Sequence, residues 1–295
     1  MEYEIKNAQL CVRISSKGGE FRSIQDTDGR EYLWQGDEAT WTDRGPNLFP
    51  YIARMTDKSY TFQGKTWHMD IHGFLPYSEM ELVSQEEKKL VMRLDSSPET
   101  LEKYPFVFSL EIQWELKENT LEITYRVLNK DTKTMYFGIG GHPGFRVPWG
   151  NDTEFTDYFL DFGERTEPTR VGFSEDCFVN GNDVPFTLRE NRYLDLKHDL
   201  FDQDAIVLQG APRHVVLASE KCKKAIEVSF PKMPYIGFWH WPKTEVPYVC
   251  IEPWSSLPSR KGVVEDLEKQ ENLISLDAGG IYENQWSITL KETDK

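Results

Sequence analysis

Two short segments place a proton-transferring side chain beside glycine or proline. His142 lies in the segment GIGGHPGFRVP, residues 138–148. Glu252 follows the apolar run of residues 248–251, so we expect it at the end of a buried strand. A carboxyl group is costly to bury unless it is paired or has a function. Because an imidazole and a carboxylate can both donate and accept protons near neutral pH, the two segments indicate acid–base chemistry.

Both residues also have a purely structural interpretation. His142 could cap a carbonyl group in a tight turn, and Glu252 could form a buried salt bridge. The glycines around His142 carry no side chain, so another segment of the chain or a ligand can approach the imidazole closely.

Two further segments set a polar side chain in the same kind of setting. Arg54 lies near the end of DRGPNLFPYIARM (residues 43–55), and His72 lies in DIHGFLPY (residues 70–77). His72 is four residues from His68, but the segment alternates like a strand and has no His-Glu-x-x-His pattern, so we expect no metal site. The remaining histidines lack flanking glycine or proline, and we expect them at the surface or in structural contacts: His68, His198, His214 and His240.

The elements that must position these residues are strands. Alternation of apolar and polar residues predicts them near residues 2–15, 65–74, 79–95, 108–129, 214–230 and 284–293, several with an internal hairpin turn. Residues 96–105 predict one short helix. The polar stretch of residues 149–199 is expected to form loops. No linker or repeat divides the chain, so we expect one domain over residues 1–295, all-β, built as a large antiparallel β-sandwich or a barrel.

Composition excludes several classes of partner. The net charge of -15 argues against a nucleic acid or an anionic membrane surface, because both attract lysine and arginine. The N-terminal residues are acidic and no segment reaches about 18 apolar residues, so we expect neither a signal peptide nor a membrane helix. The four cysteines, Cys11, Cys177, Cys222 and Cys250, have no C-x-x-C spacing and suggest reduced packing residues. A cytoplasmic protein is expected.

The order and spacing of LFPYIARM, IHGF, GGHPGF and CIEPW resemble the aldose 1-epimerase (galactose mutarotase-like) family, in its LacX-like branch. The resemblance runs from the first strand to the closing segment LDAGGIYENQWSITL. It implies the family's many-stranded antiparallel β-supersandwich, an isomerase activity in carbohydrate metabolism, a small sugar as the substrate and no cofactor or metal.

The resemblance also assigns roles to single residues. His142 matches the general acid that protonates the sugar ring oxygen, and Glu252 matches the base that deprotonates the anomeric hydroxyl. Arg54 and His72 match residues that hydrogen-bond the sugar, and Asn47 lies near a family substrate contact. A substrate-binding aspartate should lie in FDQDAIVLQG, where Asp204 is preferred over Asp202.

Some positions leave the substrate open. Pro143 and Gly144 stand where well-studied galactose mutarotases have a bulkier aromatic residue, so the pocket wall should differ. Aromatic side chains at Phe74, Trp239, Trp241 and Trp254 could contact the C–H face of a sugar or pack in the core. The cations Arg146, Lys243, Arg260 and Lys261 lie near the motifs and could bind a phosphate.

Three alternatives to a mutarotase of free aldohexoses follow from these residues. The first is a hexose-6-phosphate 1-epimerase. The second is a carbohydrate-binding protein without turnover, which the presence of both His142 and Glu252 disfavours. The third is a glycoside-cleaving enzyme with Glu252 and Asp204 as its carboxylates, in which the two histidines and Arg54 have no natural role.

Overall fold

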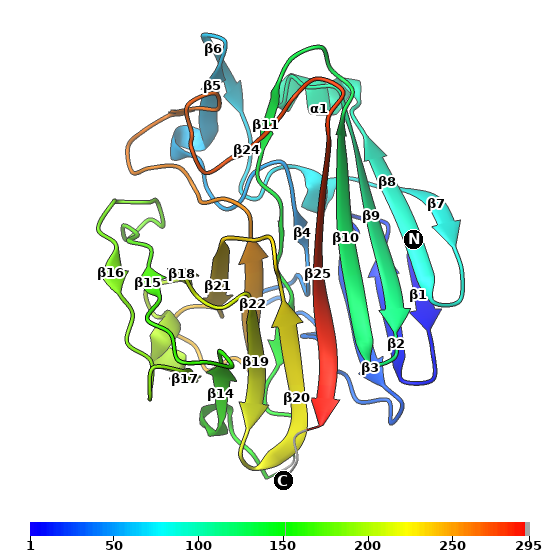
Figure 1. Ribbon diagram of the computed structural model, residues 1–295, viewed down its shortest axis with the longest axis vertical. Helices are drawn as coiled ribbons and strands as arrows, with labels where there is room; N and C mark the ends of the chain where they lie inside the picture. The colour runs from blue at the N-terminus through cyan, green and yellow to red at the C-terminus, as the bar shows by residue number, and fades with distance from the viewer. Residues whose placement is uncertain (151, 293–295) are drawn as a thin grey trace.

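Regular alternation of apolar residues produces the long strands of the structure. In β10 (Thr120–Asn129), every second residue is buried, and its partner β9 (Phe108–Lys117) shows the same pattern from Leu110 onward. The computed structural model describes residues 1–150 and 152–292, and nearly all of its regular structure is antiparallel β-strand (Figure 1). The all-β expectation is therefore confirmed.

The larger layer is a nine-stranded antiparallel sheet. Its strands, in spatial order, are β17 (Tyr193–Asp195), β14 (Tyr158–Asp161), β19 (His214–Ser219), β20 (Cys222–Ser229), β25 (Ile281–Glu292), β10, β9, β8 (Lys89–Asp95) and β7 (Glu81–Gln85). The strand β25 from the end of the chain lies in the middle of this sheet, between β20 and β10.

There is a second sheet of eight strands; in Figure 1 its strands β21 and β22 lie close to β19, and its strands β15 and β16 lie at the left. Its strands are β16 (Val184–Pro185), β15 (Thr169–Arg170), β18 (Ile206–Gln209), β21 (Tyr235–Trp239), β22 (Tyr248–Trp254), β12 (Gly140–Gly141) and β4 (Asn47–Leu48), with β13 (Gly144–Arg146) also paired to β22. Most of these strands are short. Asn47 and Glu252 lie on them, and His142 and Asp204 lie in segments directly beside them.

Smaller elements complete the fold. The small sheets are β1 (Glu2–Lys6), β2 (Leu10–Ser15) and β3 (Phe21–Asp26); β5 (Ser59–Phe62), β6 (Lys65–His68) and β23 (Glu265–Asp266); and β11 (Met135–Phe137) with β24 (Ile274–Leu276). The helices are α1 (Pro98–Lys103) and the 3₁₀ turns η1 (Thr56–Lys58), η2 (Leu75–Tyr77), η3 (Phe155–Asp157) and η4 (His198–Phe201). The short helix predicted at residues 96–105 is α1, which Ser97 caps.

The two large sheets enclose the main core. One cluster of buried apolar side chains includes Ile123 and Val127 of β10 together with Val249 and Ile251 of β22. The cluster extends along the chain from residue 5 to residue 288. The odd-numbered residues of β22 therefore face the core, and the even-numbered residues face the opposite side of the second sheet.

The structure differs from the expectation of loops over residues 149–199. Among the described residues of this stretch, the short strands β14, β15, β16 and β17 extend both large sheets. Tyr158 and Leu160 of β14 bury their side chains, and β14 pairs with β19 and β17. Strands of two to four residues are too short to show alternation in the sequence, and their partners hold them in place.

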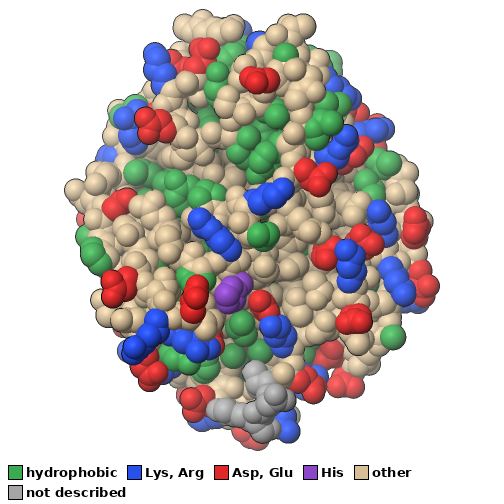
Figure 2. Space-filling model, in the orientation of Figure 1, with side chains coloured by type: hydrophobic (Ala, Val, Ile, Leu, Met, Phe, Trp, Pro, Cys, Tyr) green, Lys and Arg blue, Asp and Glu red, His purple; other side chains and the backbone are tan. Residues whose placement is uncertain are grey.

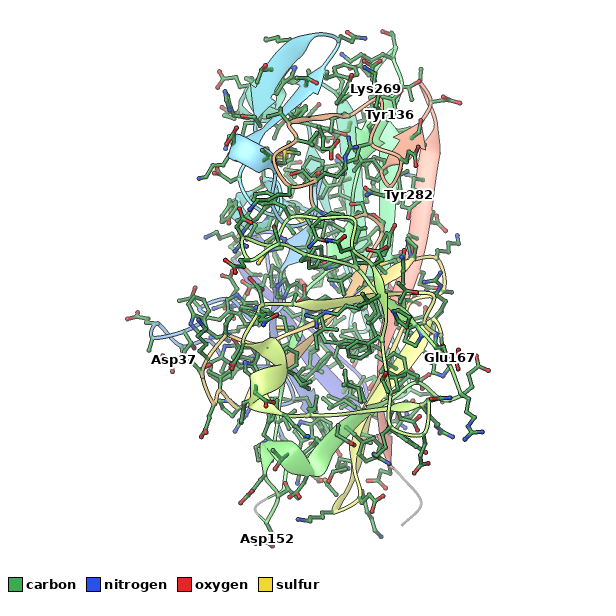
Figure 3. The ribbon with its side chains drawn as sticks, turned by 90° about the vertical axis from the view of Figure 1, so that its left-hand side faces the viewer. Asp37, Tyr136, Asp152, Glu167, Lys269 and Tyr282 are labelled. Atoms are coloured by element: carbon green, nitrogen blue, oxygen red, sulfur yellow. The ribbon has the colours of Figure 1, made fainter. Side chains whose placement is uncertain are left out.

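Charged side chains are distributed over the surface without a large basic patch on the visible face. Figure 2 shows acidic and basic groups interspersed, and Figure 3 shows the acidic residues Asp37, Asp152 and Glu167 at the periphery. No helix within residues 1–150 and 152–292 is long and apolar enough to span a membrane.

Candidate active site

The register of β22 brings His142 beside Glu252. Gly140 of β12 pairs with Trp254, and Gly144 of β13 pairs with Cys250. His142 lies between these two short strands, so it comes opposite the residue halfway between their partners, which is Glu252. The His142 amide donates to the Pro46 carbonyl at 2.9 Å, which fixes the backbone at this point.

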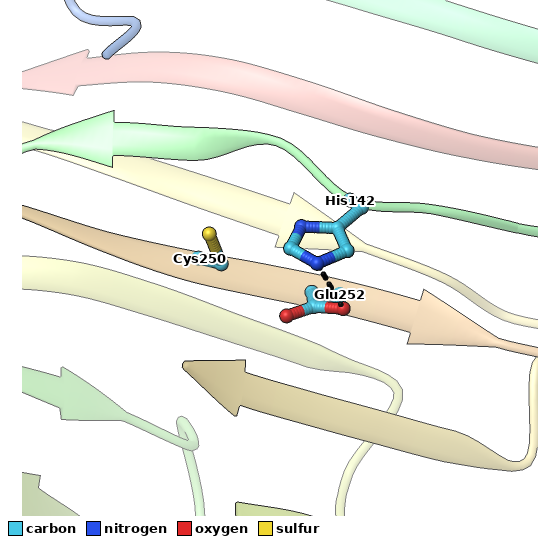
Figure 4. Close-up of side chains that lie close together, drawn as sticks. All are labelled: His142, Cys250 and Glu252. Carbon is cyan, nitrogen blue, oxygen red and sulfur yellow. Dashed lines mark ion pairs between the residues drawn. The ribbon is translucent and has the colours of Figure 1, made fainter. Parts of the chain in front are cut away.

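The two side chains are in contact. His142 Nε2 lies 3.2 Å from Glu252 Oε2, and the side chains project toward each other from adjoining segments of the second sheet (Figure 4). Glu252 is 1% exposed and His142 is 8% exposed. Two of their polar atoms, Glu252 Oε1 and His142 Nδ1, have no hydrogen-bond partner among the described residues. Buried polar atoms are normally paired, so these two are available to a ligand.

Burial sets the protonation of this pair. It raises the pKa of Glu252 well above its usual range, and the nearby Asp204 carboxylate acts in the same direction. Burial and the neighbouring His72 hold the pKa of His142 well below its usual range. Desolvation thus favours the uncharged pair, in which the carboxyl group carries the pair's single proton, over the ion pair.

Glycines near His142 make room for tryptophan rings. A Cβ at Gly144 would lie 2.7 Å from the Trp41 ring, and one at Gly141 would lie 2.5 Å from the Trp286 ring. The Trp41 ring in turn lies 5.0 Å from the His142 imidazole, centre to centre. The space left by these glycines is therefore filled by other segments of the chain.

His72 presents a defined tautomer to the pocket. Its Nδ1 accepts a hydrogen bond from the Ala53 amide at 3.1 Å, so the neutral ring carries its proton on Nε2. Burial and Arg54 lower the pKa of His72 to about 4, which keeps the ring neutral at physiological pH. His72 has a left-handed backbone (φ +63°), and its ring lies 5.6 Å from that of His142.

Asp204 is held from three sides. Its Oδ1 accepts from the Ala205 amide at 2.9 Å. Its Oδ2 accepts from the Cys177 thiol at 2.8 Å and lies 3.7 Å from Arg54 Nη1. Burial and this hydrogen bond raise the pKa of Cys177 to about 11, so the thiol remains a donor.

One pocket of about 280 Å³ collects most of the predicted residues. Arg54, His72, His142, Asp204 and Glu252 all line it. Asp202 does not, and it lines another cavity, so of these two candidates Asp204 is the one that reaches this pocket.

Asn47 is not among the residues that line the pocket. Its fully buried amide donates to the carbonyls of Gly18 and Gly19, at 3.2 and 2.7 Å. Its Oδ1 accepts from the Tyr125 hydroxyl at 2.7 Å. These contacts use both ends of the amide and connect β4 to the turn at residues 18 and 19 and to Tyr125 of β10. The expected contact of Asn47 with the substrate stays a prediction.

Aromatic residues form much of the pocket wall. Trp239, Trp241 and Trp254 line it, as the motifs suggest, whereas Phe74 packs in the main core. The sequence analysis missed Trp41, which lines the pocket from a polar segment, DEATWTDRGP. A large aromatic residue inside such a polar loop was the available signal.

The basic residues that the sequence offered for binding a phosphate do not line this pocket. Arg260 forms a two-point ion pair with Glu265, and Lys261 pairs with Asp176. Arg146 and Lys243 do not line the pocket, where Arg54 is the one Lys or Arg side chain among the described lining residues. Its acidic lining residues are Asp43, Asp204 and Glu252, so the pocket favours a neutral ligand.

Cys250 is the third residue at the base of the site. One ligand atom each from His142, Cys250 and Glu252 lies within 4.8 Å of the others, a spacing that a metal ion could bridge (Figure 4). Burial raises the pKa of the Cys250 thiol well above its usual range, with a further contribution from Glu252. A protonated thiol is a poor metal ligand, so these residues fit acid–base chemistry better than metal binding.

The fold and the site together define a class. The antiparallel sandwich is the fold of galactose mutarotase-like proteins. A galactose mutarotase related enzyme from Lactobacillus acidophilus superposes with a TM-score of 0.95 at 29% identity, over 100% of this chain and 99% of that one. A galactose mutarotase-like protein from Lactobacillus casei superposes with a TM-score of 0.93 at 28% identity, over 98% and 100% of the two chains.

Sequence comparison gives the family. The aldose 1-epimerase family model matches residues 1–271. The chromosomal protein LacX of Lactococcus lactis subsp. lactis is 31% identical over 289 residues, which cover 94% of this chain and 96% of LacX. The chain belongs to the aldose 1-epimerase family, and that family implies a sugar substrate.

Proposed function

We propose that the protein is an aldose 1-epimerase, which interconverts the α and β anomers of a free aldohexose. The observation that carries this proposal is the buried contact of 3.2 Å between His142 Nε2 and Glu252 Oε2 at the pocket. The reaction needs one acid and one base acting on two oxygens of the same carbon atom. A pair of side chains that already touch suits two reacting oxygens so close together.

The proposed reaction opens and closes the sugar ring. Glu252 removes the proton from the hydroxyl on C1, the C1–O5 bond breaks as the C1 carbonyl forms, and His142 protonates O5. Rotation about the C1–C2 bond turns the other face of the aldehyde toward O5. The reverse proton transfers then close the ring with the opposite configuration.

The single proton of the pair matches this requirement. The working state needs an ionised Glu252 and a protonated His142, and this state differs from the neutral pair only by transfer of one proton between the two residues. His72 Nε2–H would donate to a sugar oxygen, while Asp204 and Arg54 would bind hydroxyls further from C1. Trp41 and Trp239, whose rings lie 5.0 and 5.7 Å from that of His142, would contact the C–H face of the sugar.

Polarimetry of freshly dissolved α-D-galactose and α-D-glucose tests the proposal. The native protein should accelerate anomer interconversion above the buffer rate. Glu252→Gln and His142→Gln should each lower kcat by about 10²- to 10⁴-fold, because each removes one proton-transfer group. The double variant should be little worse than either single variant, since the two groups act as a unit.

Glu167→Gln, at the exposed surface, is the matched control and should keep the native rate. Native-like activity in Glu252→Gln would exclude Glu252 as the base. If the native protein accelerates neither sugar, hexose 6-phosphates are assayed next. Calorimetric titration with both sugars then tests the remaining alternative, a binding protein without turnover.

A further inference from the structure

The imidazole of His142 is oriented by packing instead of by a second hydrogen bond. Its Nε2 faces Glu252, and its Nδ1 has no hydrogen-bond partner within residues 1–150 and 152–292. In many histidines with a chemical role, the hydrogen bond of the second nitrogen fixes both the ring and the position of its proton. Here the neighbouring side chains must hold the ring in place.

Three rings surround this imidazole. The Trp41 ring lies 5.0 Å away, centre to centre, and its plane is 33° from that of the imidazole. The rings of Trp239 and His72 lie at 5.7 and 5.6 Å and are nearly perpendicular to it, at 83° and 85°. Edge-to-edge contact would separate two ring centres by roughly 6 Å or more, because carbon atoms in contact lie about 3.5 Å apart. The Trp41 and His142 rings are closer than this, so their faces overlap in part.

Trp41 is itself held in place. Its carbonyl accepts hydrogen bonds from the Asp37 amide at 2.9 Å and from Trp34 Nε1 at 3.0 Å. Its side chain packs on Gly144, where a Cβ would lie 2.7 Å from the indole. The residue is 9% exposed although it lies in a polar loop. The loop is therefore built to bring this indole to one position.

That position is beside the strand of the carboxyl group. Tyr248, Cys250 and Glu252 alternate along β22 and so lie on one face of the strand. Trp41 packs in a small apolar cluster with Tyr248 and Cys250. In Figure 4, Cys250 lies beside the pair of His142 and Glu252. The indole thus contacts both the face of β22 that carries Glu252 and the ring of His142.

The proposed reaction needs a charged His142 in this buried site. Burial disfavours an imidazolium because it removes hydration. The face of an indole carries partial negative charge and attracts a cation that lies within about 6 Å of its centre. Trp41 presents such a face at 5.0 Å. Its contact therefore offsets part of the cost of forming the imidazolium.

We propose that Trp41 is a positioning residue for His142: its indole face holds the imidazole against Glu252 and stabilises the imidazolium that protonates the sugar ring oxygen. This inference rests on the proposed function.

Two substitutions separate the ring face from the apolar side chain. Trp41→Leu keeps an apolar side chain without a ring, and Trp41→Phe keeps a ring face. In the polarimetric assay, Trp41→Leu should lower kcat roughly tenfold through the lost contact with the cation, and Trp41→Phe should stay within about threefold of the native kcat. Trp41 also lines the pocket, so a change in KM is expected in both variants and kcat decides. Equal losses of kcat in the two variants, or no loss in either, would overturn the proposal.

Trp67→Leu is the matched control. Trp67 does not line the pocket, so this variant should keep the native kcat and KM.

Gly144→Ala tests the same contact with the indole still present. Its Cβ would lie 2.7 Å from the Trp41 ring, so the ring must move. We expect kcat to fall by about three- to tenfold. The double variant Trp41→Leu with Gly144→Ala should be no slower than Trp41→Leu alone, because no indole remains to be displaced. Losses that multiply in the double variant would show two independent effects and would contradict the proposal.

Nuclear magnetic resonance of the imidazole separates this inference from the proposed function. The ring signals of His142 are assigned by their loss in His142→Gln. The order parameter of its ring C–H bonds should be about 0.85, as in rigid backbone, in native protein and Trp41→Phe, and should fall below about 0.6 in Trp41→Leu. An equally ordered ring in all three proteins would overturn the positioning role, whether or not any sugar is turned over. If the native protein turns over no aldose but the ring loses order only in Trp41→Leu, the positioning role stands and the proposed function fails.

Discussion

Glu252 connects the chemistry of the site to the stability of the fold. Its carboxyl group lies on a strand whose seven residues are all buried, and Oε1 has no partner among the described residues. Ionising such a group in the folded protein is unfavourable, because burial removes its hydration. A hydrophobic residue would pack here without this cost, so the carboxyl group is best explained by function.

A pH dependence of stability follows from the raised pKa of Glu252. Below about pH 4.5 the carboxyl is protonated in both the folded and unfolded states. As the pH rises, the unfolded state releases this proton first, so the free energy of unfolding falls until the pH passes the folded-state pKa. Glu252→Gln cannot ionise, and its Tm relative to native protein should increase steadily above pH 4.5.

Thermal unfolding at several pH values between 4.5 and 8.5 measures this difference. The control Glu167→Gln should follow the native protein at every pH, since its side chain is exposed. A Tm difference between Glu252→Gln and native protein that does not change with pH would contradict the burial argument.

His72 should lower the free energy of unfolding as the pH falls, whereas Glu252 lowers it as the pH rises. Its pKa is about 4 in the folded protein against about 6.5 in the unfolded chain, so its contribution is complete above pH 6.5 and is lost as the pH falls toward 4. The full contribution is about 3 kcal/mol. His72→Asn, which tolerates the left-handed backbone and keeps an acceptor for the Ala53 amide, should lose less stability than native protein between pH 7 and 4.5.

Urea unfolding at these two pH values gives the comparison. His142 also has a lowered pKa, so part of the acid sensitivity remains in the variant. Identical losses of stability in native protein and in His72→Asn would show that His72 does not titrate in this range.

At the scale of elements, the site depends on two short strands, β12 and β13, which are separated by two residues. β12 and β13 both pair with β22, and the two residues between them cannot continue the pairing, so His142 leaves the sheet toward Glu252. The glycines permit close packing on both sides: Trp286 of the nine-stranded sheet presses on Gly141, and Trp41 packs on Gly144. The loop that carries His142 is therefore fixed by packing between the layers.

Gly141→Ala should disturb this packing. Its Cβ would lie 2.5 Å from the fully buried Trp286 ring, so the ring or β12 must move, at a cost of roughly 1–3 kcal/mol. Gly237→Ala is the matched control, because its Cβ meets neighbours at ordinary distances of 3.4 Å or more. Urea denaturation should show the larger loss in Gly141→Ala, and equal losses would contradict the packing argument.

At the scale of the whole molecule, the two ends of the chain share one core. Ile5 and Ile288 belong to the same buried cluster, from which we infer a single domain. The last long strand, β25, lies between β20 and β10 in the centre of the nine-stranded sheet. β25 lies beyond residue 271, where the match to the family model ends. Without β25, the nine-stranded sheet would be divided between β20 and β10.

Truncation after Gly280 tests this dependence. Removing β25 leaves the edges of β20 and β10 unpaired and takes away the buried side chains of Trp286 and Ile288. Circular dichroism and thermal unfolding should show loss of the cooperative transition. The control is full-length protein with Gln285→Ala on the exposed face of β25, which should keep the native transition. A truncated chain with a native-like transition would contradict the single-domain inference.

The sequence by itself predicted the long strands and indicated residues suited to acid–base chemistry. Period-two alternation is a local property, so the hairpins of β7 with β8, β9 with β10 and β19 with β20 could be predicted from neighbouring residues. The residue types and their glycine or proline settings indicated His142 and Glu252. The spacing of the motifs indicated the family, which the comparisons confirm.

The tertiary structure alone decided which residues meet. The contact between His142 and Glu252 follows from the register of β12, β13 and β22, which depends on pairing over more than a hundred residues of sequence. The same long-range packing directs Asn47 to the carbonyls of Gly18 and Gly19 and brings Trp41 onto His142. Local patterns carry no information about such distant pairings, because these depend on the packing of the two sheets as a whole.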